Sequence, residues 1–423
     1  MLERPSFPRL GAGTRHHRPL GQTGEGSDWL LAFTGISGIA GMMIAYVPWG
    51  LIRAMQRGSI ELTSPRGVWI FNCAILPSRL HRTVERKGNM KPDQDLFGKT
   101  SRTAFVTGGS GGLGKAISNI LAARGANVTI FARRPGPLAD AQNEIGGNCV
   151  DADRQEIDAV AVDMADASAV SDAFRSQPRI ADFLYCCAGG NHAENGFFID
   201  LQATQLDSCM KNNYYSTAYA AKAMLDIWVE DDKKYPGTDV STSDTTGPKP
   251  RRIVFANSAA AFLGLPGSVA YTPAKSAVRA LADTLRLEVL RHNSARTTYT
   301  IHIAFPADFI SPGFVLEQDT KPDLTKRIQG TNVATFAQLE EKFPSSEKVA
   351  QGIVARVDRG DFIICEDSLA ASLLFTNMVG LSPKRGLGIV DSLWSVVMGW
   401  FVVPVLRRRW EKMCREDAIN RLR

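Results

Sequence analysis

The chain has 423 residues, of which 44% are hydrophobic and 22% charged, and this composition excludes a disordered, collagen-like or wholly membrane-embedded chain. Its 49 lysines and arginines against 43 acidic residues leave a net charge of +6. No basic stripe with interleaved aromatic residues crosses the middle of the chain, which argues against a nucleic-acid partner.

The first hundred residues divide into three parts. Residues 1–29 are rich in Gly, Pro, Arg and His without periodicity and predict a mobile arm. Residues 30–52 carry no charge, and a helix of this length spans about 34 Å, enough to cross a hydrocarbon core of about 30 Å. We predict a transmembrane helix there. The alternatives are a buried core helix, a signal-peptide core or a mispredicted extension of the gene. Residues 53–99 are expected to form a linker, and arginines beyond the apolar run place the downstream part in the cytosol.

Short apolar runs alternate with helical stretches over residues 100–366. Runs without polar alternation are typical of a parallel sheet covered by helices on both faces. The expected fold is α/β, a doubly wound parallel sheet of the Rossmann type in a single catalytic domain. Residues 231–252 are polar and rich in Pro, Gly, Ser and Thr, and predict an exposed surface insertion. The expected strands are Ala104–Thr107, Val128–Phe131, Ala159–Val162, Phe183–Cys187, Ile253–Ala256, Thr300–Phe305 and Phe362–Cys365.

The last part of the chain, residues 367–423, contains two apolar runs, Leu369–Leu381 and Ile389–Leu406, and ends in a basic tail. It predicts a membrane-associated segment anchored by tryptophans and by Arg407–Arg409. The second run is marginal for a span, so an interfacial helix, a re-entrant hairpin and a helix packed on the catalytic domain are the alternatives. The seven cysteines are scattered without metal-ligand spacing and predict free thiols in a reducing compartment, with no metal site.

A glycine-rich turn with Gly108, Gly112 and Gly114 joins the first strand to the first helix. Glycine lets the chain turn sharply and lets its backbone approach a pyrophosphate, which a helix N-terminus attracts. The turn therefore predicts a dinucleotide site, and an ordinary strand-to-helix turn is the alternative.

The second strand is followed by Arg133 and Arg134, where an enzyme that prefers NAD usually has an acidic residue. Two guanidinium groups favour a ribose 2′-phosphate and hence NADPH, with a solvated basic loop as the alternative. Asp163, after the third strand, is expected either to accept from the adenine amino group or to cap a helix.

Ser258, Tyr271 and Lys275 form the expected chemical end of the site. Tyr271 and Lys275 share one face of a helix, so the ammonium is expected to lower the pKa of the phenol from about 10. Tyr271 could then donate a proton to a ketone oxygen whose carbon receives hydride, while Ser258 binds the same oxygen. Taken alone, such a pair is more often an ordinary pair on a helix surface.

Together these motifs resemble the short-chain dehydrogenase/reductase family over residues 100–310. Thr107-Gly108-x-x-x-Gly112-x-Gly114, an Ala188-Gly189 turn, Asn213, Ser258 and Tyr271-x-x-x-Lys275 occur in the family's order. The resemblance implies that Tyr271 is the general acid and base and that Ser258 polarises the carbonyl. Lys275 would tune Tyr271 and bind the nicotinamide ribose. Asn213 would hold a water of the proton relay, with Asn212 as the competing register. The implied cofactor contacts are Gly108, Ser110, Gly112, Leu113, Gly114, Arg133, Arg134, Asp163, Ala188, Gly189, Tyr271, Lys275, Pro306, Ile310 and Ser311.

One departure from the family pattern lies at Cys186-Cys187, where the family usually has two asparagines before Ala-Gly. Asparagine side chains that support the central sheet are therefore missing, which affects stability rather than chemistry. The spacing from the glycine turn to Tyr271 is also longer than usual, and the expected insertion accounts for it.

Within the family, the segments Phe305–Phe314 and Glu317–Pro322 and the basic C-terminus are similar to 3-ketodihydrosphingosine reductases, best to the fungal branch. This resemblance implies NADPH-dependent reduction of 3-ketodihydrosphingosine to dihydrosphingosine, a step of sphingolipid synthesis. It also implies a homo-oligomer at the endoplasmic reticulum membrane, with its catalytic domain facing the cytosol. Asp308 is a candidate for receiving the substrate ammonium, and a turn role is its alternative. The competing functions are a membrane-associated reductase of a steroid, retinoid or fatty-acyl ketone, and a non-catalytic NADPH-binding regulator.

Overall fold

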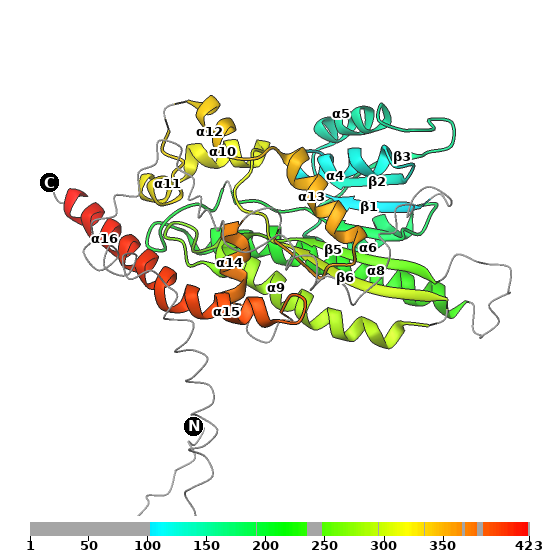
Figure 1. Ribbon diagram of the computed structural model, residues 1–423. Coiled ribbons are helices and arrows are strands. Elements are labelled where there is room, and N and C mark those ends of the chain that lie inside the picture. The colour runs from blue at the N-terminus through cyan, green and yellow to red at the C-terminus, as the bar shows by residue number, and fades with distance from the viewer. Residues whose placement is uncertain are drawn as a thin grey trace, which may run out of the picture. The chain divides into compact units, whose positions relative to one another are not determined.

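A sheet of seven parallel strands, in the order β3-β2-β1-β4-β5-β6-β7, forms the centre of the fold (Figure 1). The computed structural model describes residues 102–421 apart from 192, 235–247, 295, 334, 366–368 and 379–383. These belong to one of two compact units, Ala74–Arg423. The expected arm, transmembrane helix and linker over residues 1–99 lie outside the described residues. The strands are β1 Thr103–Thr107, β2 Asn127–Ala132, β3 Ile157–Ala161, β4 Phe183–Cys186, β5 Lys249–Ala256, β6 Thr297–Ala304 and β7 Ile363–Ile364.

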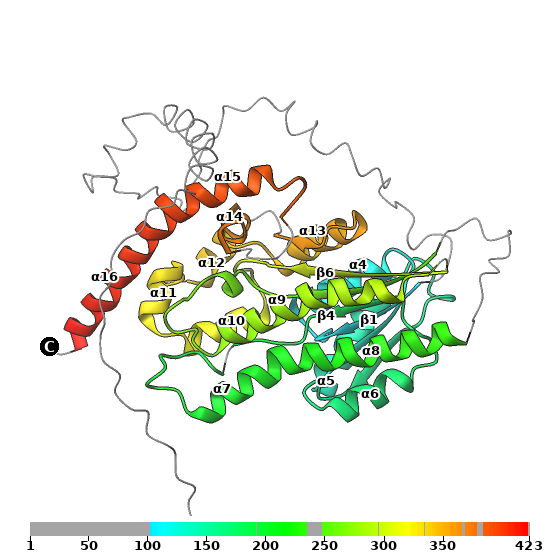
Figure 2. The same cartoon turned by 90° about the horizontal axis from the view of Figure 1, so that it is seen from below.

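The sheet is doubly wound, as predicted, because helices cover both of its faces (Figure 2). One face packs against α4, α5 and α13, and the other against α6, α8 and α9. Both cores consist mainly of buried aliphatic and aromatic side chains, which explains why the strands carry continuous apolar runs. The bounds are α4 Gly112–Ala122, α5 Pro135–Gly146, α6 Ala167–Arg175, α8 Ser216–Lys233, α9 Tyr271–Glu288 and α13 Ser346–Asp358.

Strand β1 lies between β2 and β4, so the direction of winding reverses at this position. In such folds ligands bind outside the carboxyl ends of the strands at the reversal. The remaining elements belong to the connections at that edge or to the C-terminal part of the chain. They are α7 Ala203–Met210, α10 Pro312–Thr320, α11 Asp323–Gln329, α12 Phe336–Lys342, α14 Leu369–Met378, α15 Ile389–Val397 and α16 Val403–Arg421. Single turns of 3₁₀-helix (Ala259–Phe262, Val289–His292) and π-helix (Lys211–Tyr215, Met398–Val402) complete the set.

The expected surface insertion is shorter than predicted. Helix α8 continues to Lys233 and β5 begins at Lys249, so residues 231–233 and 249–252 belong to regular elements. Arg251 is 1% exposed because its guanidinium bonds the Asp231 carboxylate at 2.5 Å and lies over the Trp228 ring. Polar residues that are paired in this way can be buried, which the composition of the segment does not reveal. Residues 235–247 lie outside the described part.

The hydrophobic core does not end at the expected domain boundary at residue 366. Phe375 of α14 is 1% exposed and packs against Phe262 and Phe305, with ring centroids 5.9 and 6.5 Å apart. The first apolar run of the C-terminal segment therefore completes the core of the α/β domain. The second run is part of a helix over Ile389–Trp410 that is long and apolar enough to cross a membrane, by length and composition alone.

Candidate active site

The glycine turn has the backbone that a dinucleotide site requires. Gly108 has a φ of +69°, and a Cβ there would lie 2.8 Å from the nitrogen of Ala188. A Cβ on Gly114 would lie 2.4 Å from the carbonyl oxygen of Gly108. Helix α4 begins at Gly112 without a side-chain cap and without an acidic residue in its first turn. Its first N–H groups are therefore available to an anion, as a pyrophosphate needs.

The turn after β4 is held by Thr107. Its hydroxyl accepts hydrogen bonds from the backbone nitrogens of Cys187 and Ala188, at 3.1 and 3.2 Å. Cys186 is 1% exposed and belongs to the hydrophobic core. Thr107 and apolar packing thus hold the junction where the resemblance led us to expect asparagines. The described cysteines are free thiols, as predicted, at Cys149, Cys186, Cys187, Cys209 and Cys365.

Arg133 and Arg134 follow β2 and are both exposed. Within the described part of the chain, neither guanidinium has a hydrogen bond or an ion pair. Asp163 is also exposed, and its Oδ1 accepts from the nitrogen of Ala165 at 3.0 Å, which forms a turn. The capping role that the sequence offered to Asp163 belongs instead to Asp166, which caps α6.

Ser258, Tyr271 and Lys275 come together at the carboxyl end of β5. Ser258 follows this strand, and its hydroxyl is hydrogen-bonded to Tyr271, the first residue of α9. Lys275 lies one turn later, is 4% exposed, and places its Nζ 5.5 Å from the centre of the Tyr271 ring. The same Nζ donates to the carbonyl oxygen of Ala256 at 3.3 Å. The predicted proton donor, its serine and its lysine thus form one cluster.

The electrostatics of this cluster correct the prediction for the phenol. Burial raises the pKa of Tyr271, the Glu317 charge adds to this, and the hydrogen bond from Ser258 opposes it. Burial also lowers the pKa of Lys275, whose Nζ lies 5.5 Å from the centre of the Tyr271 ring, to about 8. The phenol is therefore protonated at neutral pH, which is the form that a proton donor needs.

Asn213 lies on the π-helical turn between α7 and α8 and is fully buried. Its Nδ2 donates to the carbonyl oxygen of Gly190 at 2.8 Å, and its Oδ1 accepts from the Gly190 nitrogen at 3.1 Å. A Cβ on Gly189 would lie 2.7 Å from the same Oδ1. Asn212 instead bonds Ser208 and Glu194. Asn213 is thus the residue that supports the Ala-Gly turn, and its role in a proton relay stays a prediction.

The loop after β6 reaches the glycine turn. Ser311 caps α10, and its Cβ lies 3.3 Å from the position that a Cβ on Gly112 would take. Pro306 accepts from the nitrogen of Ala259 at 2.9 Å, and Ile310 donates to the carbonyl oxygen of Pro344 at 2.8 Å. These contacts place Ser311 beside the glycine turn and Pro306 beside the residue that follows Ser258, whereas Ile310 joins the loop to the segment before α13.

Two further residues of the glycine turn have different environments. Leu113 is 8% exposed and its side chain belongs to the core, so it can offer a cofactor only its backbone. Ser110 is partly buried at the turn.

Asn257 is a site residue that the sequence analysis missed. It is 4% exposed, its Oδ1 accepts from the Ser258 nitrogen at 2.9 Å, and its Nδ2 donates to the Lys275 carbonyl oxygen at 3.0 Å. The sequence signal that could have indicated it is its position, directly after an apolar strand and before the candidate serine. Burial of an amide is stable only when its groups are paired, so such a position indicates a support.

Comparison with known proteins agrees with this geometry. The family described as short chain dehydrogenase matches residues 102–304. The 3-ketodihydrosphingosine reductase ksrA of Aspergillus fumigatus is 31% identical over 331 residues, which are 74% of this chain and 84% of that protein. The ketoreductase sphF of Aspergillus fumigatus is 99% identical over 99 residues, which are 23% of this chain and 24% of that protein, so this match spans about a quarter of the relative. A short-chain dehydrogenase/reductase of Burkholderia phymatum, solved with NAD, matches with a TM-score of 0.50 and 17% identity over 66% of this chain and 92% of that one, which shows a common fold.

Proposed function

The chain belongs to the short-chain dehydrogenase/reductase family, and from this premise we propose that it reduces 3-ketodihydrosphingosine to dihydrosphingosine in sphingolipid biosynthesis, using NADPH. The observation that carries the reaction type is the cluster of Ser258, Tyr271 and Lys275 at the edge of the sheet where ligands bind. The substrate is supported by the name of a relative that the chain covers over 84% of its length.

The residues of the cluster divide the work at the ketone. A nicotinamide cofactor held at the glycine turn and the start of α4 would supply the hydride. Ser258 hydrogen-bonds the carbonyl oxygen and orients it toward Tyr271, which donates its proton as negative charge develops there. Lys275, mostly protonated below pH 8, provides positive charge next to the phenolate that remains. Asn213 holds the turn at Gly189–Gly190 and so keeps the adjoining cofactor crevice in shape.

The preference for NADPH is supported by Arg133 and Arg134. They are exposed and unpaired within the described part of the chain, and they follow β2, the strand whose end binds the adenine ribose in this fold. A 2′-phosphate would give both guanidinium groups a partner, whereas a ribose hydroxyl would not.

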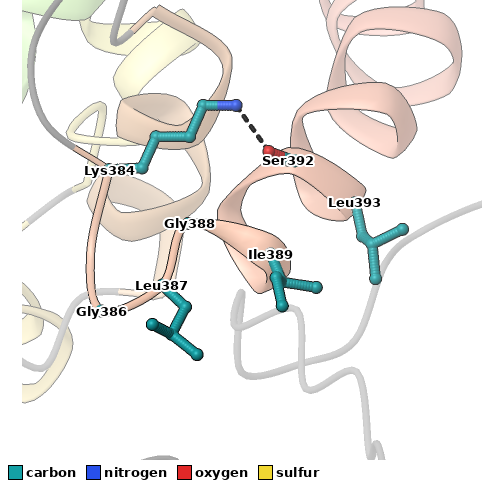
Figure 3. A pocket seen from close by; sticks show the side chains of 7 residues that line it. All are labelled: Lys384, Gly386, Leu387, Gly388, Ile389, Ser392 and Leu393. Atoms are coloured by element: carbon teal, nitrogen blue, oxygen red, sulfur yellow. Dashed lines mark hydrogen bonds between the residues drawn. The ribbon is translucent and has the colours of Figure 1, made fainter.

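We also propose that the enzyme acts at the endoplasmic reticulum membrane, with its catalytic domain in the cytosol. The support is the helix Ile389–Trp410, whose outward side is apolar: Trp400 is 77% exposed and Val396 is 56% exposed. Figure 3 shows the hollow where this helix begins: Lys384 donates to the Ser392 hydroxyl at 2.6 Å, and apolar side chains extend on the other side.

A homo-oligomer is proposed through α8 and α9, which lie next to each other on one face of the sheet (Figure 2). Leu287 and Leu290 near the end of α9 are 57% and 55% exposed, and a second copy could cover them. Light scattering of the purified protein measures the number of copies directly.

The test of the function is turnover by the purified chain of 3-ketodihydrosphingosine beside a steroid ketone, each with NADPH and with NADH. We expect reduction of the sphingoid ketone with NADPH, and loss of turnover by about 10²–10⁴-fold in Tyr271→Phe with cofactor binding retained. Turnover of the steroid ketone alone would replace the substrate assignment. A Tyr271→Phe chain that keeps full function in cells would favour a non-catalytic regulator.

A further inference from the structure

Helix α10 faces the protein with a side that is polar apart from Phe314. Phe314, Glu317, Gln318 and Lys321 recur at helical spacing, and all are buried or partly buried. The opposite side carries Val315 and Leu316, which are 38% and 49% exposed. An ordinary surface helix has the reverse arrangement.

The same helix contacts segments of the candidate site at both of its ends. At its start, Ser311 lies against Gly112 of the glycine turn. At its end, the Thr320 hydroxyl accepts from Asn195 of the loop after β4 at 3.2 Å. Helix α11, which follows, bonds Pro266 through Thr325 at 2.8 Å, a few residues before Tyr271. The polar side of α10 is therefore directed toward the region between the cofactor end and the chemical end.

Two buried polar atoms on this side have no hydrogen-bond partner within the described part of the chain. They are Oε1 of Gln318 and Nζ of Lys321, and the Lys321 side chain is only 2% exposed. The Lys321 ammonium has an ion-pair contact with Glu317, with Nζ 3.3 Å from Oε2. Lys321 can only donate and already contacts Glu317, whereas Oε1 of Gln318 is an acceptor without a donor. A buried acceptor without a hydrogen bond is costly, so the Gln318 oxygen points to a ligand that donates, such as an ammonium group.

The charges in this cluster leave room for one more cation. Asp308 and Glu317 are near enough to influence each other and Tyr271, and both feel the charge of Lys321. The second lysine that Asp308 feels, Lys342, is exposed, and its ammonium bonds the Gly330 carbonyl oxygen. The buried groups are therefore two carboxylates and one ammonium, with a net charge of −1 when all are ionised. A singly charged ammonium group would balance it.

We propose that Glu317, with Asp308 beside it, binds the ammonium group of an amino ketone substrate while Tyr271 protonates the neighbouring ketone oxygen. This inference rests on the proposed function, since 3-ketodihydrosphingosine carries its amine on the carbon next to the ketone. Glu317 is thus a specificity-determining residue for this head group. Asp308, to which the sequence analysis assigned the ammonium, supplies the second negative charge.

The test compares two substrates of equal chain length with NADPH: 3-ketodihydrosphingosine and 1-hydroxyoctadecan-3-one, which lacks the amine. In Glu317→Gln we expect kcat/KM for the amino ketone to fall by about 10- to 100-fold, and kcat/KM for the other ketone to change by less than about threefold. Asp319→Asn, which removes an exposed charge from the same helix, is the matched control and should change neither value. Glu317→Asp keeps the charge and should keep part of the preference, and it serves as the second variant if Glu317→Gln does not fold.

Equal losses on both substrates would overturn the proposal, because they would show that Glu317 acts through the Tyr271 proton or through the fold. Unchanged values on both would overturn it as well. A wild-type chain that reduces only the ketone without the amine would instead refute the proposed function itself, so the two failures are distinguishable.

Discussion

The side-chain amide of Asn257 donates a hydrogen bond to the main-chain carbonyl oxygen of Lys275, 3.0 Å away. The same side chain accepts from the backbone nitrogen of Ser258 at 2.9 Å. Ser258 follows β5 and Lys275 lies on α9, so one buried amide sets the distance between the two elements that carry the chemistry. Asn257 is a positioning residue, since it bonds the backbone of the cluster.

Asn257→Ala should lower both stability and turnover. It leaves the Ser258 N–H without this partner and removes the second bond to the Lys275 carbonyl, which keeps its place in the helical ladder of α9, at about 1–3 kcal/mol in total in the free energy of unfolding. We expect kcat to fall by more than the affinity for the cofactor, because the glycine turn and the start of α4 lie at the other end of the site. Denaturant unfolding and steady-state kinetics measure the two effects. Asn148→Ala, at an exposed asparagine, is the control, and an unchanged kcat in Asn257→Ala would contradict the positioning role.

Lys275→Met should remove activity and yet stabilise the protein at neutral pH. Burial lowers the pKa of Lys275 from 10.5 to about 8, so the unfolded chain binds the proton more tightly than the folded chain. The charged lysine therefore costs the folded state free energy below pH 8, and this cost disappears as the pH rises from 8 to 10.5. Methionine removes it, with a gain of up to about 3 kcal/mol at pH 7.

The measurement is the free energy of unfolding of both chains between pH 7 and pH 10.5. The two curves should converge as the pH rises, because wild-type stability gains from loss of the proton. Lys222→Met, at an exposed lysine paired with Asp226, should show no such dependence. If the stability gained by Lys275→Met over wild type is smaller at pH 7 than at pH 10.5, burial does not lower the pKa of Lys275.

The sheet could be predicted from the sequence because a parallel strand that is buried on both faces shows as a continuous apolar run. Phe183–Cys186 is such a run and was located to within one residue. Strand β5 was predicted to begin at Ile253 but begins at Lys249, because Arg251 is buried only through Asp231 and the Trp228 ring. Such pairing joins residues that are far apart in the chain, so a local pattern cannot indicate it.

In the site, too, features that depend on neighbouring residues could be predicted, whereas those that depend on distant segments could not. Tyr271 and Lys275 are one helical turn apart, so their shared face follows from spacing alone. The direction of the Tyr271 pKa does not, because burial and the Glu317 charge depend on how α10 folds over the crevice. The sequence also did not predict which side of α10 faces the protein, because its apolar residues face solvent, the reverse of the usual pattern.

Replacing Arg133 and Arg134 together by alanine should change the choice of cofactor. Each guanidinium is expected to give the 2′-phosphate a charge-assisted hydrogen bond, so kcat/KM with NADPH should fall by about 10- to 100-fold while the value with NADH stays within about threefold. Arg154→Ala removes a charge that is 86% exposed on the same half of the domain, and it should affect neither cofactor. Equal losses with both cofactors would assign the arginines to the pyrophosphate or to the fold.

The helix Ile389–Trp410 should lie in the plane of the membrane rather than cross it. Asp391 and Met398 are 2% and 3% exposed because this side of the helix packs on the catalytic domain. Near its other end, α16 contacts α11 (Figure 2). A helix held against a polar domain along one side cannot be surrounded by lipid, whereas its apolar outer side can enter the interface with arginines at the end reaching the head groups.

Cysteines introduced at Gly386 and Lys412, on either side of this helix, test its orientation in sealed vesicles. Both should react with an impermeant thiol reagent from the same side, after subtraction of the reaction of the native cysteines. Trp400→Glu should weaken the insertion of the apolar outer side of this helix into the lipid interface. Leu287→Glu, at an exposed leucine on α9, should not. If the two cysteines react from opposite sides, the helix spans the bilayer, and the contacts of Asp391 and α16 with the domain must open when the chain inserts.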